Sequence, residues 1–375
     1  TGRAARSAAE RLGDDMSLSV SIKKTLGAFH LNVSFECESG ILGLLGASGC
    51  GKSMTLKCSA GIETPDEGSI VLDGRVLFDS KRKIDLPPQK RRVGYLFQNY
   101  ALFPNMTVRQ NIAAGVSKKR PNREQFLDEK IHALYLDGLE NKYPYQLSGG
   151  QQQRAALARI LASEPELILL DEPFSALDSY LRWQLEQELV STLENFSGCA
   201  LFVSHSRDEV YRICQNVCVI NQGRSEPMLP VRTLFEDPST LSAALLSGCK
   251  NYTRIHPLSE NAIFAQDWGV SLGVAHKTDP SFAYAGVRAH FIHPATEEGP
   301  NTFPCAVTRV VQDVFSTIVM LRPVSAPPEG EVCASYDAIR IEMSKEDWAA
   351  LCPNGQAPER LLVHIAPQDI LLLHP

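Results

Sequence analysis

The residues from Gly46 to Ser53 read GASGCGKS, which matches the phosphate-binding pattern G-x-x-x-x-G-K-[ST]. The apolar run Ile41–Leu45 in front of the loop is typical of a buried strand, and the segment behind it is typical of a helix that ends at Gly61. In this setting successive backbone N–H groups converge on one anion, and the helix N-terminus adds its positive dipole end. The pattern therefore predicts a site for a nucleoside triphosphate.

Particular side chains of this loop suit particular parts of the ligand. Lys52 can reach the β- and γ-phosphates, and the Ser53 hydroxyl can ligate Mg²⁺. Phe29 could stack on an adenine ring, with an ordinary core phenylalanine as the alternative. The residues predicted to contact ATP here are Gly46, Ala47, Ser48, Gly49, Cys50, Gly51, Lys52, Ser53 and Met54.

Two carboxylates follow a second apolar run, Leu167–Leu170. Asp171 closes this run and could hold Mg²⁺ through water opposite Ser53. Glu172 comes next and is suited to deprotonate an attacking water, an assistance typically worth ~10²–10⁴ in rate. Because a proline restricts the residue before it, we expect Pro173 to keep Glu172 in an extended backbone.

Gln98 and His205 end two further predicted strands. The Gln98 amide could contact Mg²⁺ or the attacking water, and His205 could donate a hydrogen bond to a γ-phosphate oxygen. Either residue alone is more typical of a structural role, and the functional interpretation rests on the whole cluster. We predict Glu172, His205 and Gln98 as catalytic residues, and Ser53, Gln98 and Asp171 as the residues that hold the metal.

The segment LSGGQ, Leu147–Gln151, opens a long predicted helix. Its start would expose backbone N–H groups, a second arrangement suited to an anion. Since the chain already has one complete phosphate loop, this second cradle makes sense if it faces the nucleotide of another copy. We therefore predict a two-fold homodimer with two composite sites. The residues of the second cradle predicted to contact ATP are Ser148, Gly149, Gly150 and Gln151.

Composition argues against several classes of protein. The chain has 375 residues, a formal net charge of −6 and 21% charged residues, which does not suggest a nucleic-acid binder. Its ten cysteines form no C-x-x-C pair, so we expect unpaired thiols in a reduced, cytosolic protein. No apolar run approaches the ~20 residues that cross a bilayer, and no signal peptide is visible. At a membrane, another chain would have to supply the spanning part.

Strands and helices alternate over the first part of the chain, which predicts an α/β fold with its site at the carboxyl edge of the strands. Residues 18–35 alternate like two antiparallel strands, and we expect this pair to flank the strand before the phosphate loop. Asp73-Gly74 predicts a hairpin. Residues 216–223 are expected to form an edge strand.

Beyond about residue 250, short alternating runs separated by turn signals predict a small β-barrel or sandwich. We therefore predict a nucleotide-binding domain over residues 16–240, with a helical subdomain at about 99–150, and a C-terminal β regulatory domain over 250–375. Residues 1–15 precede Met16, the expected start. We interpret them as an upstream extension, residues added for expression or the tail of a preceding domain.

Over residues 18–223 the motifs follow the order found in the ATPase subunits of ABC transporters, a family that this chain resembles. They correspond to the Walker A loop, the Q-loop at Gln98, the LSGGQ signature, Walker B with Glu172, the D-loop Ser175–Asp178 and the switch histidine His205. The resemblance implies an α/β P-loop ABC ATPase core with a helical subdomain, followed by a small all-β domain similar to TOBE or oxyanion-binding domains. It also implies ATP and Mg²⁺ as cofactors, a contact between Asp178 and ATP, and a head-to-tail dimer around ATP.

Within that family, the segments DGRVLFDSKRKIDLPPQKRRVGYLFQNYALFP, VSHSRDEV and SGCKNYTRI are similar to the ATPases of molybdate importers. This similarity implies the motor subunit of a molybdate or tungstate importer, a homodimer at the cytoplasmic face of the membrane. Its partners would be two transmembrane permease subunits and, indirectly, an external solute-binding protein, with no nucleic acid. Residues 99–107 would contact the membrane subunit or form the core of the helical subdomain.

Two alternatives to a molybdate importer remain open. One is an importer ATPase for another solute, such as sulfate, ferric iron or a polyamine. The other is an ABC ATPase that acts on ribosomes or DNA without a transporter. The single cassette, the absence of a heptad run and the C-terminal β domain argue against this second alternative.

Overall fold

The computed structural model describes residues 17–175, 179–194, 196, 198–327 and 338–375. The chain divides into two compact units, Thr1–Val231 and Arg232–Pro375. Each unit has a hydrophobic core of its own. Within the described residues, no helix combines the length and the apolar content that crossing a bilayer requires.

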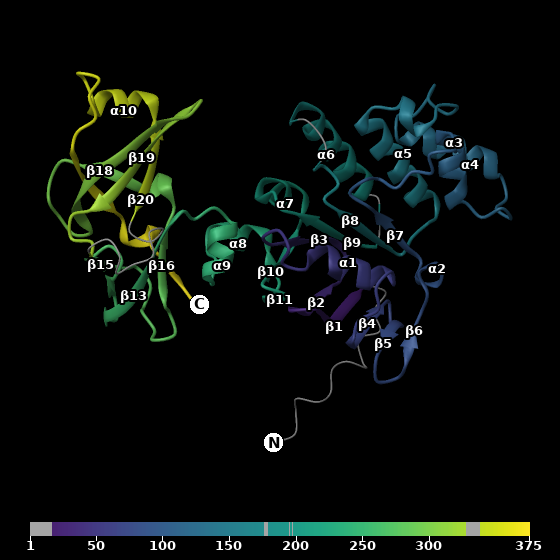
Figure 1. Cartoon of the computed structure of the whole chain (residues 1–375), viewed down its shortest axis with the longest axis horizontal. Helices are drawn as coiled ribbons and strands as arrows, with labels where there is room; N and C mark the ends of the chain where they lie inside the picture. The colour runs from purple at the N-terminus through teal and green to yellow at the C-terminus, as the bar shows by residue number, and fades with distance from the viewer. Residues whose placement is uncertain (1–16, 176–178, 195, 197, 328–337) are drawn as a thin grey trace. The chain divides into compact units, whose positions relative to one another are not determined.

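The first unit is built on one large sheet, with strand order β6-β5-β4-β1-β2-β11-β10-β3-β9-β8-β7 and β12 paired to β10 (Figure 1). Its antiparallel part contains β1 (Leu18–Leu26), β2 (Phe29–Cys37), β4 (Glu67–Leu72), β5 (Arg75–Asp79) and β6 (Ile84–Asp85). Its parallel part contains β3 (Gly40–Leu45), β7 (Val93–Leu96), β8 (Leu167–Asp171), β9 (Cys199–Ser204) and β10 (Asn216–Asn221). The short strands β11 (Arg224–Ser225) and β12 (Leu229–Pro230) pair with β10.

Strand pairing confirms some predictions and corrects others. The strands β1 and β2 form the predicted antiparallel pair, and β4 and β5 form the hairpin around Asp73-Gly74. The prediction that the β1–β2 pair flanks β3 is wrong, because β10 and β11 lie between β2 and β3. The predicted edge position of β10 is also wrong, since β10 pairs in parallel with β3. Alternation along one segment carries no information about which distant strand lies beside it.

Helices pack around this sheet and form a separate group between β7 and β8 (Figure 1). Those that follow sheet strands are α1 (Lys52–Ala60), α2 (Pro88–Arg91), α6 (Ser179–Glu194) and α7 (Arg207–Ile213). The group between β7 and β8 consists of α3 (Val108–Gly115), α4 (Arg123–Ala133), the 3-10 turn η1 (Pro144–Gln146) and α5 (Gly149–Ala162). The helix α1 ends where Gly61 adopts a φ of 77° and its N–H reaches the Cys58 carbonyl, a common way to end a helix.

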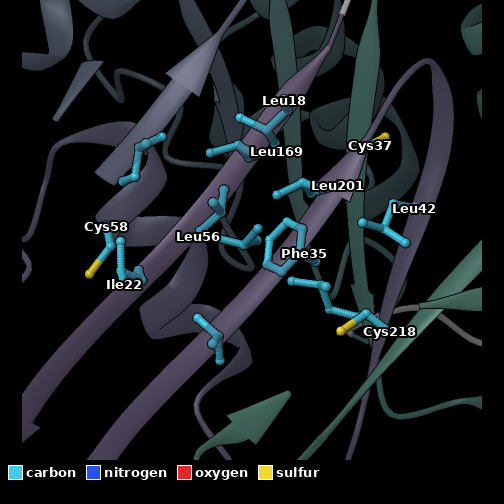
Figure 2. Close-up of a cluster of buried hydrophobic side chains, with 14 of the residues drawn as sticks. Leu18, Ile22, Phe35, Cys37, Leu42, Leu56, Cys58, Leu169, Leu201 and Cys218 are labelled. Atoms are coloured by element: carbon cyan, nitrogen blue, oxygen red, sulfur yellow. The ribbon is translucent and has the colours of Figure 1, made fainter. Parts of the chain in front are cut away.

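The core of the first unit combines residues of α1 with residues of the sheet strands (Figure 2). Leu18 and Ile22 of β1 and Phe35 of β2 belong to the same buried cluster as Leu56 of α1 and Leu201 of β9. Full burial of one such side chain contributes roughly 1.5–3 kcal/mol to folding. Because both the antiparallel and the parallel strands contribute to this cluster, it fixes α1, and with it the loop in front of α1, in the unit.

One pair of cysteines departs from the expectation of unpaired thiols. Cys37, at the end of β2, forms a disulfide with Cys199, at the start of β9. The two residues are 162 positions apart, and they meet because Gly40, three residues after Cys37, lies opposite Cys199 in the sheet. The free cysteines of the described residues are all buried: Cys50, Cys58, Cys214, Cys218, Cys249, Cys305 and Cys352.

The second unit is the predicted β-rich domain and contains two five-stranded sheets, β15-β14-β13-β16-β22 and β17-β21-β18-β19-β20. The first sheet consists of β13 (Asn251–Ser259), β14 (Ala262–Ala265), β15 (Val270–Gly273), β16 (Tyr284–Val287) and β22 (Leu371–Leu373). The second consists of β17 (Ile292–Ala295), β18 (Thr302–Gln312), β19 (Ser316–Pro323), β20 (Ile339–Ser344) and β21 (Arg360–Ile365). Helices α8 (Val231–Glu236), α9 (Leu241–Leu246) and α10 (Lys345–Leu351) and the turns η2 (Ala289–Phe291) and η3 (Pro367–Asp369) complete it. Both sheets contribute to one core, with Trp268 fully buried in it.

Candidate functional site

The loop between β3 and α1 depends on glycine at Gly51. This residue caps α1 with a φ of 112°, in the left-handed region that other residues rarely adopt. A Cβ atom at this position would lie 2.5 Å from Leu31 Cδ1 and 3.2 Å from Phe29 Cζ. Both the backbone angle and the close approach of β2 therefore require glycine where the loop enters the helix.

Lys52 folds back into the loop. Its side-chain ammonium donates hydrogen bonds to the carbonyl oxygens of Gly46, at 2.7 Å, and Ala47, at 2.9 Å. Only 5% of Lys52 is exposed. A buried ammonium is stable only where such partners or an anion satisfy its charge. The loop carbonyls therefore hold the Lys52 ammonium in a place where an anion could replace them as its partner.

A cleft of about 530 Å³ opens beside this loop. Two cations, Lys52 and Lys57, line it together with the apolar side chains of Leu26 and Phe29. The predicted site residues in its lining are Ser48, Gly49, Gly51, Lys52, Ser53, Met54, Gln98 and Glu172. The predicted loop residues Gly46, Ala47 and Cys50 are not in the lining, and Gly46 and Cys50 are buried. A volume in this range and a lining that combines charge with apolar side chains are typical of a small-molecule site.

Ser53 and Asp171 come together as the sequence predicts. The Ser53 hydroxyl donates a hydrogen bond of 2.7 Å to Oδ1 of Asp171, whose side chain is buried at the end of β8. A carboxylate and a hydroxyl are oxygen ligands of the kind that Mg²⁺ prefers, and Mg²⁺ needs only one or two carboxylates when phosphates supply the rest. The donor set therefore fits Mg²⁺, and the described residues contain no group of three or more His, Cys, Asp or Glu suited to another metal.

Tyr95 is a member of this site that sequence reasoning missed. It lies on β7, and its hydroxyl donates a hydrogen bond of 2.9 Å to Oδ2 of Asp171. Burial, reinforced by the negative charge of Asp171, raises the pKa of Tyr95, so the hydroxyl stays a donor. The apolar run around Tyr95 reads as a buried strand, and only the parallel pairing of β7 with β8 brings Tyr95 to Asp171.

The polar contacts around Glu172 involve its side chain on one side and its backbone carbonyl on the other. Glu172 Oε2 lies 3.4 Å from His205 Nδ1, immediately after β9. The Ser175 hydroxyl donates to the Glu172 carbonyl at 3.1 Å, and Gln98 Nε2 donates to the Ser175 hydroxyl at 3.3 Å. The structure thus brings the side chains of Glu172 and His205 together and links Gln98, through the Ser175 hydroxyl, to the backbone of Glu172.

The backbone of Glu172 differs from the prediction. Its φ is 46°, in the left-handed region, rather than the extended conformation expected before Pro173. The Glu172 N–H donates to the Val203 carbonyl at 3.0 Å, and the Glu172 carbonyl accepts from the Ser175 N–H at 3.2 Å. The first bond is tertiary and the second closes a local turn, and together they hold a conformation that the preference imposed by proline does not favour. Backbone strain of this kind, typically ~1–3 kcal/mol, concentrates at functional sites.

The second predicted cradle, Ser148–Gln151, forms the start of α5. Ser148 caps the helix, its hydroxyl accepting from the Gln151 N–H while the Gln151 side chain accepts from the Ser148 N–H. Ser148 and Gly149 are exposed. Among the described residues, the cleft beside the phosphate loop includes none from this cradle in its lining. The predicted ATP contact Asp178 lies outside the described residues.

Comparisons with known proteins agree on one family. The family model described as "ABC transporter" matches residues 31–175. The Fe(3+) ions import ATP-binding protein FbpC of Haemophilus influenzae is 43% identical over 239 residues, which are 63% of this chain and 68% of that protein. The sulfate/thiosulfate import ATP-binding protein CysA of Vibrio vulnificus is 36% identical over 306 residues, 78% of this chain and 85% of that protein.

Two further relatives extend the comparison. The molybdenum import ATP-binding protein ModC of Paramagnetospirillum magneticum is 40% identical over 223 residues, 59% of this chain and 61% of that protein. The solved structure of cbiO1 from Clostridium perfringens, part of the ABC transporter complex cbiONQ, has a TM-score of 0.52 and 25% identity. The match covers 59% of this chain and 91% of that one. The chain belongs to the family of ATP-binding subunits of ABC importers.

Proposed function

We propose that this chain hydrolyses ATP with Mg²⁺ in the cleft beside the phosphate loop, and that it drives the import of molybdate or tungstate. The observation that carries the first part is the hydrogen bond between Ser53 and Asp171, at a cleft that Lys52 and Glu172 also line. It joins a phosphate-binding helix N-terminus to a carboxylate suited to a metal, with a candidate base beside them.

ATP would bind with its phosphates on the loop and the start of α1. Backbone N–H groups and the positive end of the α1 dipole would meet the phosphates, and Lys52 would exchange its loop carbonyls for phosphate oxygens. Lys57 adds a second positive charge to the lining. Phe29, which also lines the cleft and lies close to Gly51, would stack on the adenine ring.

Ser53, Asp171 and Gln98 are the residues that would hold Mg²⁺. The ion, when bound, would neutralise phosphate charge and polarise the γ-phosphate. Glu172 would orient the attacking water and accept its proton. His205, 3.4 Å from Glu172, would keep that carboxylate in position and donate a hydrogen bond to the γ-phosphate. Gln98 donates to the Ser175 hydroxyl, which in turn donates to the Glu172 backbone carbonyl, so Gln98 would support the backbone position of Glu172.

A second copy of the chain would complete each site. The cradle Ser148–Gln151 is exposed in part and is not in the lining of its own chain's cleft, so the start of α5 would meet the nucleotide of the partner copy. Asp178 is proposed as a further ATP contact, as the family pattern implies. The two ATP molecules would then hold two copies together until hydrolysis lets them separate.

The proposed membrane partners are two permease subunits, contacted at the cytoplasmic face through the segment 99–107, with an external solute-binding protein acting indirectly. In this segment Tyr100 is buried, whereas Phe103 and Met106 are 46% and 38% exposed. The buried tyrosine belongs to the packing of the first unit. The exposed phenylalanine and methionine supply the apolar contact that a partner would cover.

The proposed solute rests on the resemblance of several segments to molybdate importers and on the relative named as a molybdenum import protein. Relatives named for Fe(3+), for sulfate/thiosulfate and for spermidine/putrescine fall in the same range of identity, from 36% to 43%. Sequence identity therefore does not distinguish these solutes, and an uptake measurement has to identify the one that is imported.

The experiment has two stages. Binding of a fluorescent ATP analogue is titrated on the purified chain and on Lys52→Ala, and we expect the variant to lose at least ~100-fold in affinity because a charge-assisted contact to phosphate disappears. Uptake of labelled molybdate, sulfate, ferric iron and spermidine is then measured in cells that lack the gene and carry either form. The proposal is supported if the unchanged chain restores molybdate uptake and Lys52→Ala does not. Equal ATP affinity of the two forms overturns the nucleotide site, and restored uptake of another solute overturns the choice of molybdate.

A further inference from the structure

Both oxygens of the Asp171 carboxylate have hydrogen-bond partners, and the two partners differ in kind. Oδ1 accepts from the Ser53 hydroxyl at 2.7 Å, and Oδ2 accepts from the Tyr95 hydroxyl at 2.9 Å. Ser53 lies in the lining of the cleft, whereas Tyr95 does not. The carboxylate therefore has one oxygen on the ligand side and one oxygen anchored to the sheet.

The position of Tyr95 is itself fixed. Its backbone lies opposite Leu169 in the parallel pairing of β7 with β8, two residues before Asp171. Its ring packs against Phe97, with 4.3 Å between the ring centroids. Gln98 follows Phe97 directly. The strand β7 thus carries the group that holds Asp171, and the glutamine that lines the cleft lies two residues beyond the end of this strand.

We propose that Tyr95 is a positioning residue for the metal carboxylate. It holds Oδ2 of Asp171, so that Oδ1 keeps its direction when the Ser53 hydroxyl leaves it to bind Mg²⁺. This inference rests on the proposed function, because it assigns a role to Tyr95 within the same ATP and Mg²⁺ site. Partners that orient a ligating group typically change metal affinity by ~10–100-fold when they are removed.

A purely structural tyrosine would behave differently. Tyr100, five residues along the chain, is also buried, and its hydroxyl has no hydrogen-bond partner among the residues that the structure describes. The hydroxyl of Tyr95, by contrast, is directed at one carboxylate oxygen. Removing that hydroxyl while keeping the ring should therefore affect metal binding and leave folding and metal-free ATP binding in place.

The test measures Mn²⁺ affinity by electron paramagnetic resonance, with ATP bound to the full chain carrying Glu172→Gln to prevent turnover. Tyr95→Phe in that background should weaken Mn²⁺ binding by about tenfold. Affinity for ATP without metal should change less than about twofold, and the thermal midpoint without metal should stay within a few degrees. The matched control is Tyr135→Phe, which removes a hydroxyl from an exposed tyrosine of the same unit.

A double-mutant cycle separates an effect through Asp171 from a general one. Tyr95→Phe should add less than about twofold to the loss of Mn²⁺ affinity caused by Asp171→Asn, because the hydroxyl acts through that carboxylate. Unchanged Mn²⁺ affinity in Tyr95→Phe, or an undiminished effect beside Asp171→Asn, overturns the inference and leaves the nucleotide site intact. Failure of the Glu172→Gln chain to bind ATP at all overturns the proposed function, and the inference with it.

Discussion

Glu172 is the residue on which the proposed chemistry depends most directly. It lines the cleft, contacts His205 and adopts a left-handed backbone that three tertiary and turn hydrogen bonds hold in place. We expect Glu172→Gln to bind ATP with near-normal affinity and to lower the rate of hydrolysis at least ~100-fold, because the amide cannot accept a proton from water. Phosphate release and analogue titration measure the two quantities, and Glu36→Gln, an exposed carboxylate of β2, is the control. A variant that retained most of its turnover would remove Glu172 from the role of base.

The sequence predicted most of the candidate site at this scale, because its motifs are local. Lys52, Ser53 and the glycines act within one loop, and Asp171 and Glu172 are neighbours. What it could not predict depends on contacts between distant segments. The Glu172 N–H donates to the Val203 carbonyl of β9, and Tyr95 meets Asp171 only across paired strands. The extended conformation expected for the residue before proline was not found at Glu172, where backbone hydrogen bonds to Val203 and Ser175 hold a left-handed conformation.

At the scale of elements, the helix α1 is fixed at both ends. Its N-terminus follows directly on the phosphate loop. Its last turn is held by the fully buried Arg91, which donates to the carbonyls of Cys58, at 2.8 Å, and Ser59, at 3.0 Å. Burial lowers the pKa of Arg91, and the partly exposed Asp85 opposes that shift. A cation on the carbonyls at a helix C-terminus suits the helix dipole. Arg91, on α2, therefore connects Asp85 of β6 to the C-terminal end of α1, the helix that begins with Lys52.

We expect Arg91→Met to lower the free energy of unfolding by roughly 3 kcal/mol, since the buried carbonyls of α1 would lose their donors. The effect is measured by chemical denaturation of the full chain, with the loss of ATP binding as the signal for unfolding of the first unit. Lys90→Met is the matched control, because this neighbouring cation is exposed and should cost less than about 0.5 kcal/mol. Equal stability of the two variants would show that Arg91 contributes nothing specific to α1.

Element types followed from periodicity, but their arrangement did not. The β1–β2 pair and the β4–β5 hairpin are local in sequence and were predicted correctly. The place of β10 beside β3 joins segments about 175 residues apart, as does the contact of Cys37 with Cys199 over 162 residues. The side chains of Val217–Ile220 on β10 are buried, but a short apolar run alone does not reveal which strands pair with it.

At the scale of the whole molecule, one chain holds half of each proposed reaction centre. The phosphate loop and Glu172 line one cleft, while Ser148, at the start of α5, is exposed and does not belong to that lining. In the Glu172→Gln background we expect ATP to convert monomers into dimers in sedimentation experiments. Ser148→Arg should bind ATP with unchanged affinity and remain monomeric, because a bulky cation would stand where the partner's nucleotide approaches the helix N-terminus.

A control variant and the rate of hydrolysis per chain test whether Ser148 acts at the partner's nucleotide. Ser271→Arg adds the same charge at an exposed position of the second unit and should still form dimers. With Glu172 restored, the hydrolysis rate per chain should rise with protein concentration until dimers dominate, since two copies must meet for turnover. The rate of Ser148→Arg should stay low at every concentration. A rate per chain that is full and constant in dilute solution, where sedimentation finds only monomers, would mean that one chain carries a complete site, and the assignment of the α5 start to the partner's nucleotide would then have to be abandoned.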